Sequence, residues 1–133
     1  MQVLDLFCGT GNIAFEFASR GSHVTSIDKN IDCIKFVSNT SKSLNLNISV
    51  LKSDVFKFLK ANTQRYDLIF ADPPYLLENI PEIHQLVFEN NLLNENAWLI
   101  IEHGPSTKLD ALAHFVEHRK YGNVNFSFFR REE

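Results

Sequence analysis

The sequence is poor in cysteine, glycine and long apolar runs. Its 133 residues include two cysteines, five glycines and four prolines. Two cysteines cannot build the disulfide framework of a small secreted protein, and Cys8 and Cys33 lack the spacing of a metal site. The longest apolar runs are strand-sized, far short of the roughly 20 residues of a membrane span. We therefore expect a cytoplasmic protein without a membrane segment or a metal.

An excess of charge of one sign is also lacking. Thirteen Lys and Arg stand against 16 Asp and Glu, which gives a net charge of −3 at pH 7. This balance argues against a protein that only coats nucleic acid, because neutralising phosphates requires clustered Lys and Arg. There is no internal repeat or low-complexity tract. We expect one domain spanning residues 1–133, long enough to fold without cross-links.

Short apolar runs alternate with segments of helical periodicity along most of the chain. Such alternation predicts a parallel sheet with helices on both faces. A final helix is indicated by Leu109, Leu112 and Phe115, at helical spacing. The strands expected in this part are residues 2–7, 23–27, 48–51, 66–71 and 98–101.

The end of the chain has a different pattern. Residues 117–120 and 124–129 are two extended segments around Tyr121-Gly122-Asn123, and so short a turn can join only antiparallel strands. Phe126 and Phe128 alternate with polar residues, so we expect one buried face. The predicted fold is α/β: a doubly wound, mostly parallel seven-stranded sheet with an antiparallel strand at one edge. Ligands of such sheets bind beyond the carboxyl ends of the strands, where the strand order reverses.

The first two strands are each followed by residues typical of a nucleoside site. Gly9-Thr10-Gly11 allows a tight turn and a close approach of a ligand, although a turn without a ligand is an alternative. The same glycines fit a dinucleotide turn, so a nicotinamide-dependent oxidoreductase is a second alternative. Asp28 lies about 20 positions further on, where a carboxylate can accept ribose hydroxyls. Its alternative role is to stabilise the N-terminus of the next helix.

The third and fourth strands are followed by further carboxylates. Asp54 can accept a hydrogen bond from an adenine amino group, cap a helix, or do both. Asp72-Pro73-Pro74-Tyr75 is the most specific motif, because the two prolines fix the backbone and remove two N–H donors. The remaining acceptors suit an amino group, whose protons would go to the Asp72 side chain and the Pro73 carbonyl. Tyr75 offers a face on which a planar base can stack.

These motifs together resemble a known class of enzymes. The segments 5–11 and 72–75 resemble the Rossmann-like S-adenosylmethionine-dependent methyltransferases that modify exocyclic amines. Residues 99–103 and 120–124 are similar to the closing strands of the bacterial 16S ribosomal RNA guanine-N2 methyltransferase family, of the small-subunit RNA methyltransferase D type. The likeness extends along nearly the whole chain.

The resemblance implies a cofactor, a substrate and a set of site residues. The cofactor is S-adenosylmethionine, and the substrate is the N2 amine of a guanine in 16S ribosomal RNA or a small ribosomal subunit particle, modified by a monomeric enzyme. Glu102 and His103 are expected to line the strand-five side of the cleft. The residues assigned to the cofactor are Asp5, Phe7, Gly9, Gly11, Asp28, Asp54 and Val55. Those assigned to the target amine are Asp72, Pro73, Pro74 and Tyr75.

One departure from the family keeps alternatives open. Family members share a further N-terminal segment, a β-hairpin and helix that help to bind RNA, whereas here Met1 falls almost on the first strand. We expect that this segment is missing, and a non-catalytic fragment that only binds the cofactor is one alternative. An adenine-N6 or cytosine-N4 methyltransferase of other nucleic acid is another, although residues 76–96 are short for a target-recognition region. A protein-glutamine methyltransferase usually has Asn in place of Asp72, and an oxidoreductase gives the Asp-Pro-Pro-Tyr motif no role.

Overall fold

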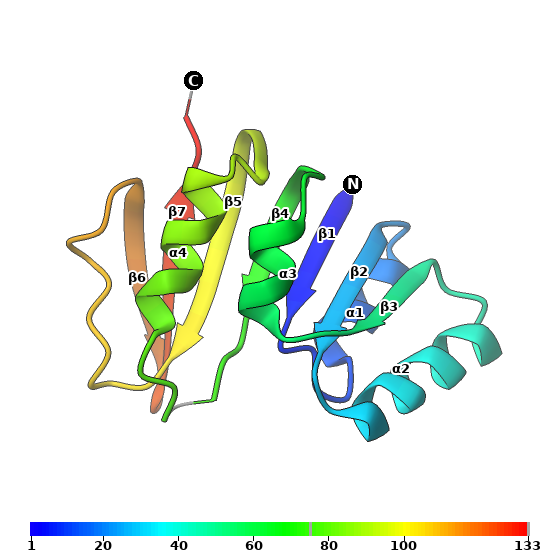
Figure 1. Cartoon of the computed structure of the whole chain (residues 1–133). Coiled ribbons are helices and arrows are strands. Elements are labelled where there is room, and N and C mark those ends of the chain that lie inside the picture. Colours follow the sequence, from blue (N-terminus) through cyan, green and yellow to red (C-terminus); the bar gives the residue numbers. More distant parts are fainter. Residues whose placement is uncertain (75, 133) are drawn as a thin grey trace.

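The computed structural model describes residues 1–74 and 76–132, and Figure 1 shows its elements. Tyr75 and Glu133 lie outside the described residues. The strands of the described residues are β1 (Gln2–Leu6), β2 (His23–Asp28), β3 (Ile48–Lys52), β4 (Tyr66–Ala71), β5 (Leu93–His103), β6 (Phe115–Tyr121) and β7 (Val124–Arg130). The helices are α1 (Asn12–Ser19), α2 (Ile31–Ser43), α3 (Val55–Ala61) and α4 (Ile80–Glu89).

The strands form one sheet in the order β3-β2-β1-β4-β5-β7-β6. Strands β1 to β5 pair in parallel, whereas β7 is antiparallel to both β5 and β6. This confirms the predicted fold class. One detail of the prediction is wrong, because β6 forms the edge and antiparallel β7 lies one strand in. The turn at Gly122 folds β7 back onto β5, and this leaves β6 outermost.

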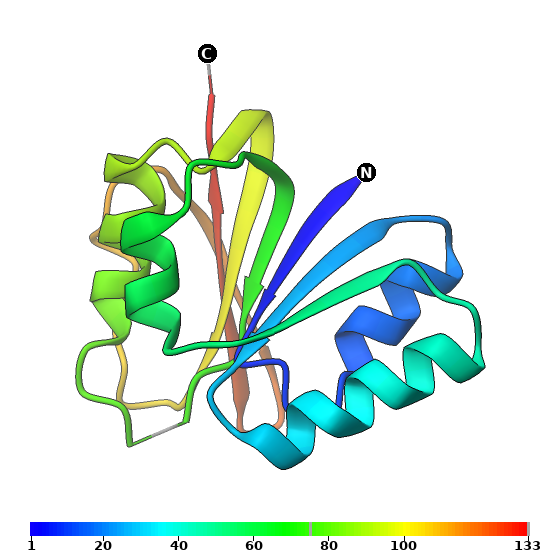
Figure 2. The ribbon, with the colours of Figure 1, turned by 45° about the vertical axis from the view of Figure 1, so that its right-hand side comes forward.

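Helices cover both faces of the sheet in two layers. Figure 2 shows α1 and α2 on one face, and α3 and α4 on the other. The chain reverses its direction of travel across the sheet between β1 and β4, which are neighbours in space. The N-terminus and the C-terminal end of β7 lie at the end of the sheet opposite to the carboxyl edge of β1 and β4 (Figure 1).

Alternation along β1 divides its side chains between two cores. Leu4 and Leu6 are fully buried in the larger core, together with residues of α3 and α4. Val3 is fully buried in the smaller core, together with residues of α1. Burying each of these side chains contributes about 1.5–3 kcal/mol. Asp5 follows the alternation and shares the face of Val3, which places a carboxylate at the end of the smaller core nearest the carboxyl edge of β1.

Side chains cap two of the helices. The Asn30 side-chain oxygen accepts hydrogen bonds from the backbone N–H groups of Asp32 and Cys33 at 2.9 and 3.1 Å. Asp54 caps α3 by accepting from the N–H of Lys57 at 3.0 Å. Pro81 occupies the first turn of α4. No helix within the described residues is long and apolar enough to span a bilayer.

The helix predicted around Leu109, Leu112 and Phe115 is wrong. Residues 104–114 form turns, and Phe115 begins β6. The three-residue spacing of the apolar residues equally suits successive turns that each direct a side chain inward, and Leu109 is indeed buried. His84 of α4 holds this segment by donating from Nε2 to the Ala113 carbonyl at 2.7 Å.

The buried face of β7 is the opposite of what the phenylalanines suggest. Asn125, Ser127 and Phe129 are buried, whereas Phe126 and Phe128 are half-buried on the other face. The polar side chains tolerate burial because each has a partner. Ser127 Oγ lies 2.8 Å from His103 Nε2, and Asn125 Oδ1 lies 2.8 Å from His118 Nε2.

Candidate active site

The turn that follows β1 lies at the carboxyl edge of the sheet and has an unusual backbone conformation. Phe7, Gly9 and Gly11 all have positive φ, of 59°, 54° and 86°. A Cβ on Gly11 would lie 2.9 Å from the Val37 side chain, so packing also requires glycine there. Gly9 has no atom within 4 Å of such a Cβ position, and its open side can admit a ligand. Phe7 holds a strained conformation that is typical of functional sites.

Asp28 joins the end of β2 to this turn. Its Oδ2 accepts from the backbone N–H of Gly9 at 3.0 Å, and its Oδ1 accepts from the N–H of Asn30 at 2.9 Å. The side chain is half-buried. Each carboxylate oxygen can accept more than one hydrogen bond, so Asp28 can position the turn and still bind a hydroxyl group.

A cavity of about 530 Å³ opens beside these residues, and most of the predicted site residues line it. Asp5 lies on a second cavity of about 210 Å³, which shares Phe7, Gly9 and Asp72 with the first. Gly11 lines neither of these cavities and acts through the shape of the turn. Tyr75 lies outside the described residues. The larger cavity is lined by Phe7, Gly9, Asp28, Lys29, Ser53, Asp54, Val55, Phe56, Asp72, Pro73, Pro74, Leu77 and Glu102.

The start of α3 supplies an apolar wall with a polar end. Val55 is buried, and the Phe56 ring meets the Phe7 ring edge-on with centroids 6.5 Å apart. Asp54 uses Oδ1 as the helix cap, so both roles predicted for this residue are compatible with its geometry. A planar group with an amino substituent fits such a wall.

The segment after β4 presents acceptors at the rim of the cavity. The Asp72 N–H donates to the Leu6 carbonyl at 3.3 Å, which extends the pairing of β4 with β1. Asp72 is exposed and Pro73 is buried. The Pro74 carbonyl accepts from the N–H of Leu77 at 2.9 Å, whereas the hydrogen bonds among the described residues leave the Pro73 carbonyl free. An exposed carboxylate is thus followed in the chain by a carbonyl that accepts no hydrogen bond from the described residues.

Asp5 is a buried carboxylate without a hydrogen-bond partner on Oδ2 within the described residues. Its side chain is 2% exposed. Burial raises its pKa to about 7, with further contributions from the negative charges of Asp72 and Asp28. A cationic ligand would relieve this cost, because an opposite charge favours the ionised form.

Glu102 brings a further carboxylate to the cavity from β5. Its pKa is raised to about 7, mainly by burial and in addition by a hydrogen bond with Asp72 and the charge of Asp72. The prediction that Glu102 faces the cleft is consistent with its place in the cavity lining. The same prediction for His103 is wrong, because alternation along β5 directs His103 to the opposite face, against Ser127.

Cys8 is a buried thiol within the glycine turn. Burial raises its pKa to about 12, and the charges of Asp5 and Asp28 act in the same direction. The thiolate form that a nucleophile requires is therefore strongly disfavoured. Within the described residues, His, Cys, Asp and Glu form no group of three or more suited to a metal ion.

Comparisons with known proteins identify the family. Residues 1–130 match the family described as conserved hypothetical protein 95. The chain belongs to this family. YlbH of Bacillus subtilis, provisionally named an rRNA methyltransferase, is 29% identical over 96% of this chain and 74% of its own length. Ribosomal RNA small subunit methyltransferase D of Buchnera aphidicola is 32% identical over 74% of this chain and 52% of its own.

Solved structures support the same placement. A conserved hypothetical protein of Streptococcus pyogenes is 28% identical, with a TM-score of 0.86 over 98% of this chain and 86% of its own. The 16S rRNA N2 G1207 methyltransferase of Thermus thermophilus has a TM-score of 0.79 over 98% of this chain and 37% of its own, and at 23% identity it shows the fold. This chain is an S-adenosylmethionine-dependent methyltransferase.

The cavity of this methyltransferase fits its cofactor by charge. S-adenosylmethionine carries a sulfonium and an ammonium group, and the cavity lining has four carboxylates against one lysine, Lys29. The unpartnered Asp5 oxygen and the open side of Gly9 are further features that a cationic ligand would use.

Some lining residues were not among the predicted site residues. Phe56 directly follows Val55, and Leu77 lies two residues after Tyr75, and their apolar character at the carboxyl edge was the available signal. Lys29 and Ser53 adjoin Asp28 and Asp54 in the same way.

Proposed function

We propose that this methyltransferase transfers a methyl group from S-adenosylmethionine to the exocyclic N2 amine of a guanine in small-subunit ribosomal RNA. The observation that carries the proposal is the exposed Asp72 carboxylate next to the Pro73 carbonyl, which accepts no hydrogen bond from the described residues, at the rim of the cofactor cavity. Two adjacent acceptors match the two protons of an amine.

The cofactor-binding roles follow the cavity from strand to strand. Asp28 would accept the ribose hydroxyls, and Asp54 would accept from the adenine amino group through the oxygen that does not cap α3. Phe7 and Val55 would contact the planar base. Asp5 would place its negative charge near the cationic end of the cofactor. Gly9 keeps the approach open.

The target amine would be held by three residues. The cofactor supplies an already activated methyl group, so no strong base is required before attack. Asp72 and the Pro73 carbonyl would accept the two amine protons and direct the nitrogen lone pair toward the cavity. Tyr75, outside the described residues, would stack on the base. A base reaches such a pocket only by leaving its stack, so the expected target is an unpaired or already splayed guanine.

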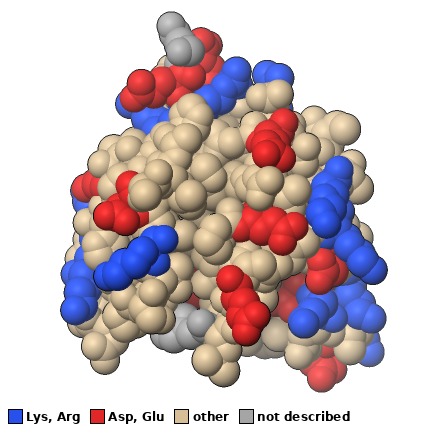
Figure 3. Space-filling model, turned by 60° about the vertical axis from the view of Figure 1, so that its left-hand side comes forward, with Lys and Arg blue, Asp and Glu red and all other residues tan. Residues whose placement is uncertain are grey.

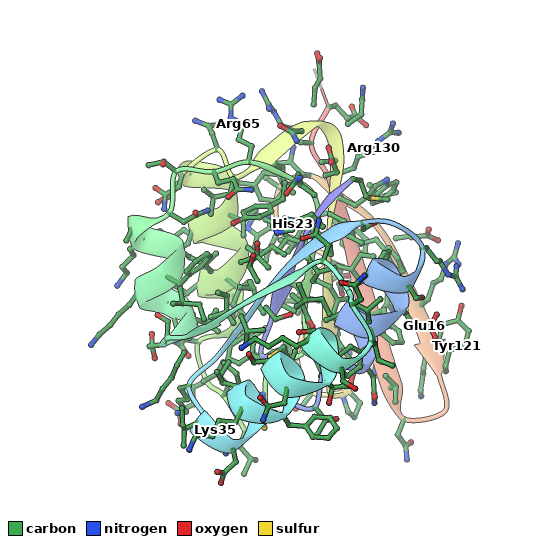
Figure 4. The ribbon with its side chains drawn as sticks, turned by 90° about the vertical axis from the view of Figure 1, so that its right-hand side faces the viewer. Glu16, His23, Lys35, Arg65, Tyr121 and Arg130 are labelled. Atoms are coloured by element: carbon green, nitrogen blue, oxygen red, sulfur yellow. The ribbon has the colours of Figure 1, made fainter. Side chains whose placement is uncertain are left out.

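Two observations support an RNA substrate and a guanine. The Buchnera relative is named for ribosomal RNA of the small subunit, and the Thermus fold neighbour was solved with AdoMet and guanosine. The face shown in Figure 3 intersperses cations with carboxylates. Arg65 and Arg130 lie toward the end opposite to the carboxyl edge, whereas Lys35 lies toward that edge (Figure 4).

A nicotinamide cofactor fits the same cavity poorly. Its pyrophosphate would meet the helix that follows the glycine turn, where the carboxylates of Asp5, Asp28 and Asp72 converge. The negative charges of the pyrophosphate and of these carboxylates would repel one another and weaken binding. S-adenosylmethionine has no phosphate and avoids this cost.

Nucleoside mass spectrometry tests the proposal. The protein is incubated with isotope-labelled S-adenosylmethionine and, separately, with small-subunit ribosomal RNA and with assembled small-subunit particles. The expected product is guanosine carrying the labelled methyl on N2. Labelled N6-methyladenosine or N4-methylcytidine would replace the proposed target, and the absence of label from both substrates would favour a protein that only binds the cofactor.

A further inference from the structure

Glu102 lies beside Asp72 because of the register between β4 and β5. Ala71, the last residue of β4, pairs with Ile101 of β5. Asp72 directly after β4 is therefore the neighbour of Glu102, the next residue of β5. Residues at equivalent positions of paired strands project to the same face. Both side chains line the larger cavity.

The two carboxyl groups form a pair in the ligand-free site. Burial raises the pKa of Glu102 to about 7, and a hydrogen bond with Asp72 and the charge of Asp72 act in the same direction. The register partner of Glu102 on the other side of β5 is Phe126 of β7. Two acceptors within hydrogen-bond reach of each other are thereby set at the rim of the site.

The Watson–Crick edge of guanine presents two adjacent donors, N1–H and the N2 amine. Adenine presents a donor beside an acceptor, N6 and N1. A pair of ionised carboxylates therefore complements guanine, because two adjacent acceptors meet the two adjacent donors of the base. Against adenine, an ionised Glu102 would face the N1 lone pair and repel it.

We propose that Glu102 is the residue that selects guanine, by accepting the N1–H proton while Asp72 accepts a proton of the N2 amine. The inference rests on the proposed function and adds a residue that determines the choice of base. Asp72 positions the reacting nitrogen, and Glu102 fixes the rotation of the base in the pocket.

Base analogues separate the two contacts. We use single-stranded uridine heptamers whose central residue is guanosine, inosine or 2-aminopurine riboside, titrated into protein saturated with S-adenosylhomocysteine and followed by fluorescence anisotropy. Inosine keeps N1–H and lacks the N2 amine, whereas 2-aminopurine keeps the amine and lacks N1–H. The proteins are wild type, Glu102→Gln and the matched surface variant Glu95→Gln on the same strand, which is exposed.

The wild type should bind guanosine about 10- to 100-fold more tightly than 2-aminopurine, as expected for one charge-assisted hydrogen bond. In Glu102→Gln this preference should fall close to one, while the preference of guanosine over inosine is retained. Glu95→Gln should behave as the wild type. An unchanged 2-aminopurine preference in Glu102→Gln, or a wild type that does not distinguish the heptamers, overturns the inference.

Methyl transfer by the wild type distinguishes this failure from that of the proposed function. If the wild type forms N2-methylguanosine on small-subunit particles and Glu102→Gln keeps its base preference, only the role of Glu102 is wrong. If the labelled methyl appears on adenine N6, the proposed function fails, and Glu102 in its protonated form would be the donor to adenine N1.

Discussion

Two clusters of buried polar side chains in this molecule differ in whether their polar atoms have hydrogen-bond partners. At the carboxyl edge of β1 and β4, the Asp5 carboxylate is buried, and one of its oxygens has no hydrogen-bond partner among the described residues. Beneath the 104–114 segment, His103 and Asn125 are just as buried, but each has a hydrogen-bond partner. The second cluster also borders a cavity, of about 290 Å³, yet its polar groups satisfy one another. We conclude that the first cluster is arranged for a ligand and the second for stability.

The ionisation of the two clusters follows the same division. Burial lowers the pKa of His103, which keeps the ring neutral. Its Nδ1 then donates to the Gly104 carbonyl at 2.9 Å, and its Nε2 accepts from the Ser127 hydroxyl. Burial raises the pKa of Asp5, but no donor compensates for its ionised form within the described residues. Such uncompensated groups are typical of functional sites.

The largest effect is expected for Asp72→Ala, which removes the acceptor of the target amine. Methyl transfer should be abolished, while the affinity for S-adenosylmethionine measured by calorimetry stays within a few-fold of wild type. Asp110→Ala, an exposed carboxylate beside the second cluster, is the matched control and should retain activity. Full activity in Asp72→Ala would remove this residue from the reaction.

Asp5 should make the ligand-free protein less stable as pH rises. Its folded-state pKa of about 7 lies above the ordinary value of 3.8, so the folded state holds the proton more tightly than the unfolded state. Its contribution to stability is full below about pH 4 and is lost by about pH 7. The loss corresponds to about 4 kcal/mol. Urea unfolding of wild type and Asp5→Asn across this range should show the difference in unfolding free energy growing in favour of Asp5→Asn, and a constant difference would refute it.

Asp28→Ala should weaken cofactor binding by about 1.5–3 kcal/mol, the cost of losing charge-assisted hydrogen bonds. Because Asp28 also holds the N–H of Gly9, Asp28→Asn serves as a comparison that keeps an acceptor for the turn. Calorimetry with S-adenosylmethionine measures both variants. Unchanged affinity in Asp28→Ala would place the ribose elsewhere.

The smallest effect on activity is expected in the second cluster. Ser127→Ala leaves His103 Nε2 without a partner, which should lower the unfolding free energy by about 1–3 kcal/mol. Cofactor affinity and methyl transfer should not change. A loss of activity at a temperature where the variant is fully folded would contradict the division between the two clusters.

The sequence predicted the site better than the end of the fold. The glycine turn, Asp28 and the Asp-Pro-Pro motif each follow a strand, so knowing the strands was enough to bring them to one edge. The pairing of Glu102 with Asp72 depends on the register between β4 and β5, which no local pattern encodes. Alternation along β5 would have placed His103 away from the cleft once Glu102 was placed in it.

The structure of residues 104–130 was harder to predict because the local sequence patterns there are compatible with two different structures. The spacing of Leu109 and Leu112 suits a helix and also successive turns. On β7, phenylalanines on one face and small polar residues on the other suggested a phenylalanine core. The hydrogen bonds of His103 and His118 reverse this outcome, and they come from distant positions in the sequence.

The most direct test of the central claim is proton release on cofactor binding. Calorimetry of S-adenosylmethionine binding at pH 7, in buffers of different ionisation enthalpy, gives the number of protons exchanged. A cationic ligand should lower the pKa of Asp5 from about 7, so binding should release protons, and Asp5→Asn should release fewer. Binding with no proton release, or the same release in Asp5→Asn, would contradict the claim that this buried carboxylate is reserved for the cofactor.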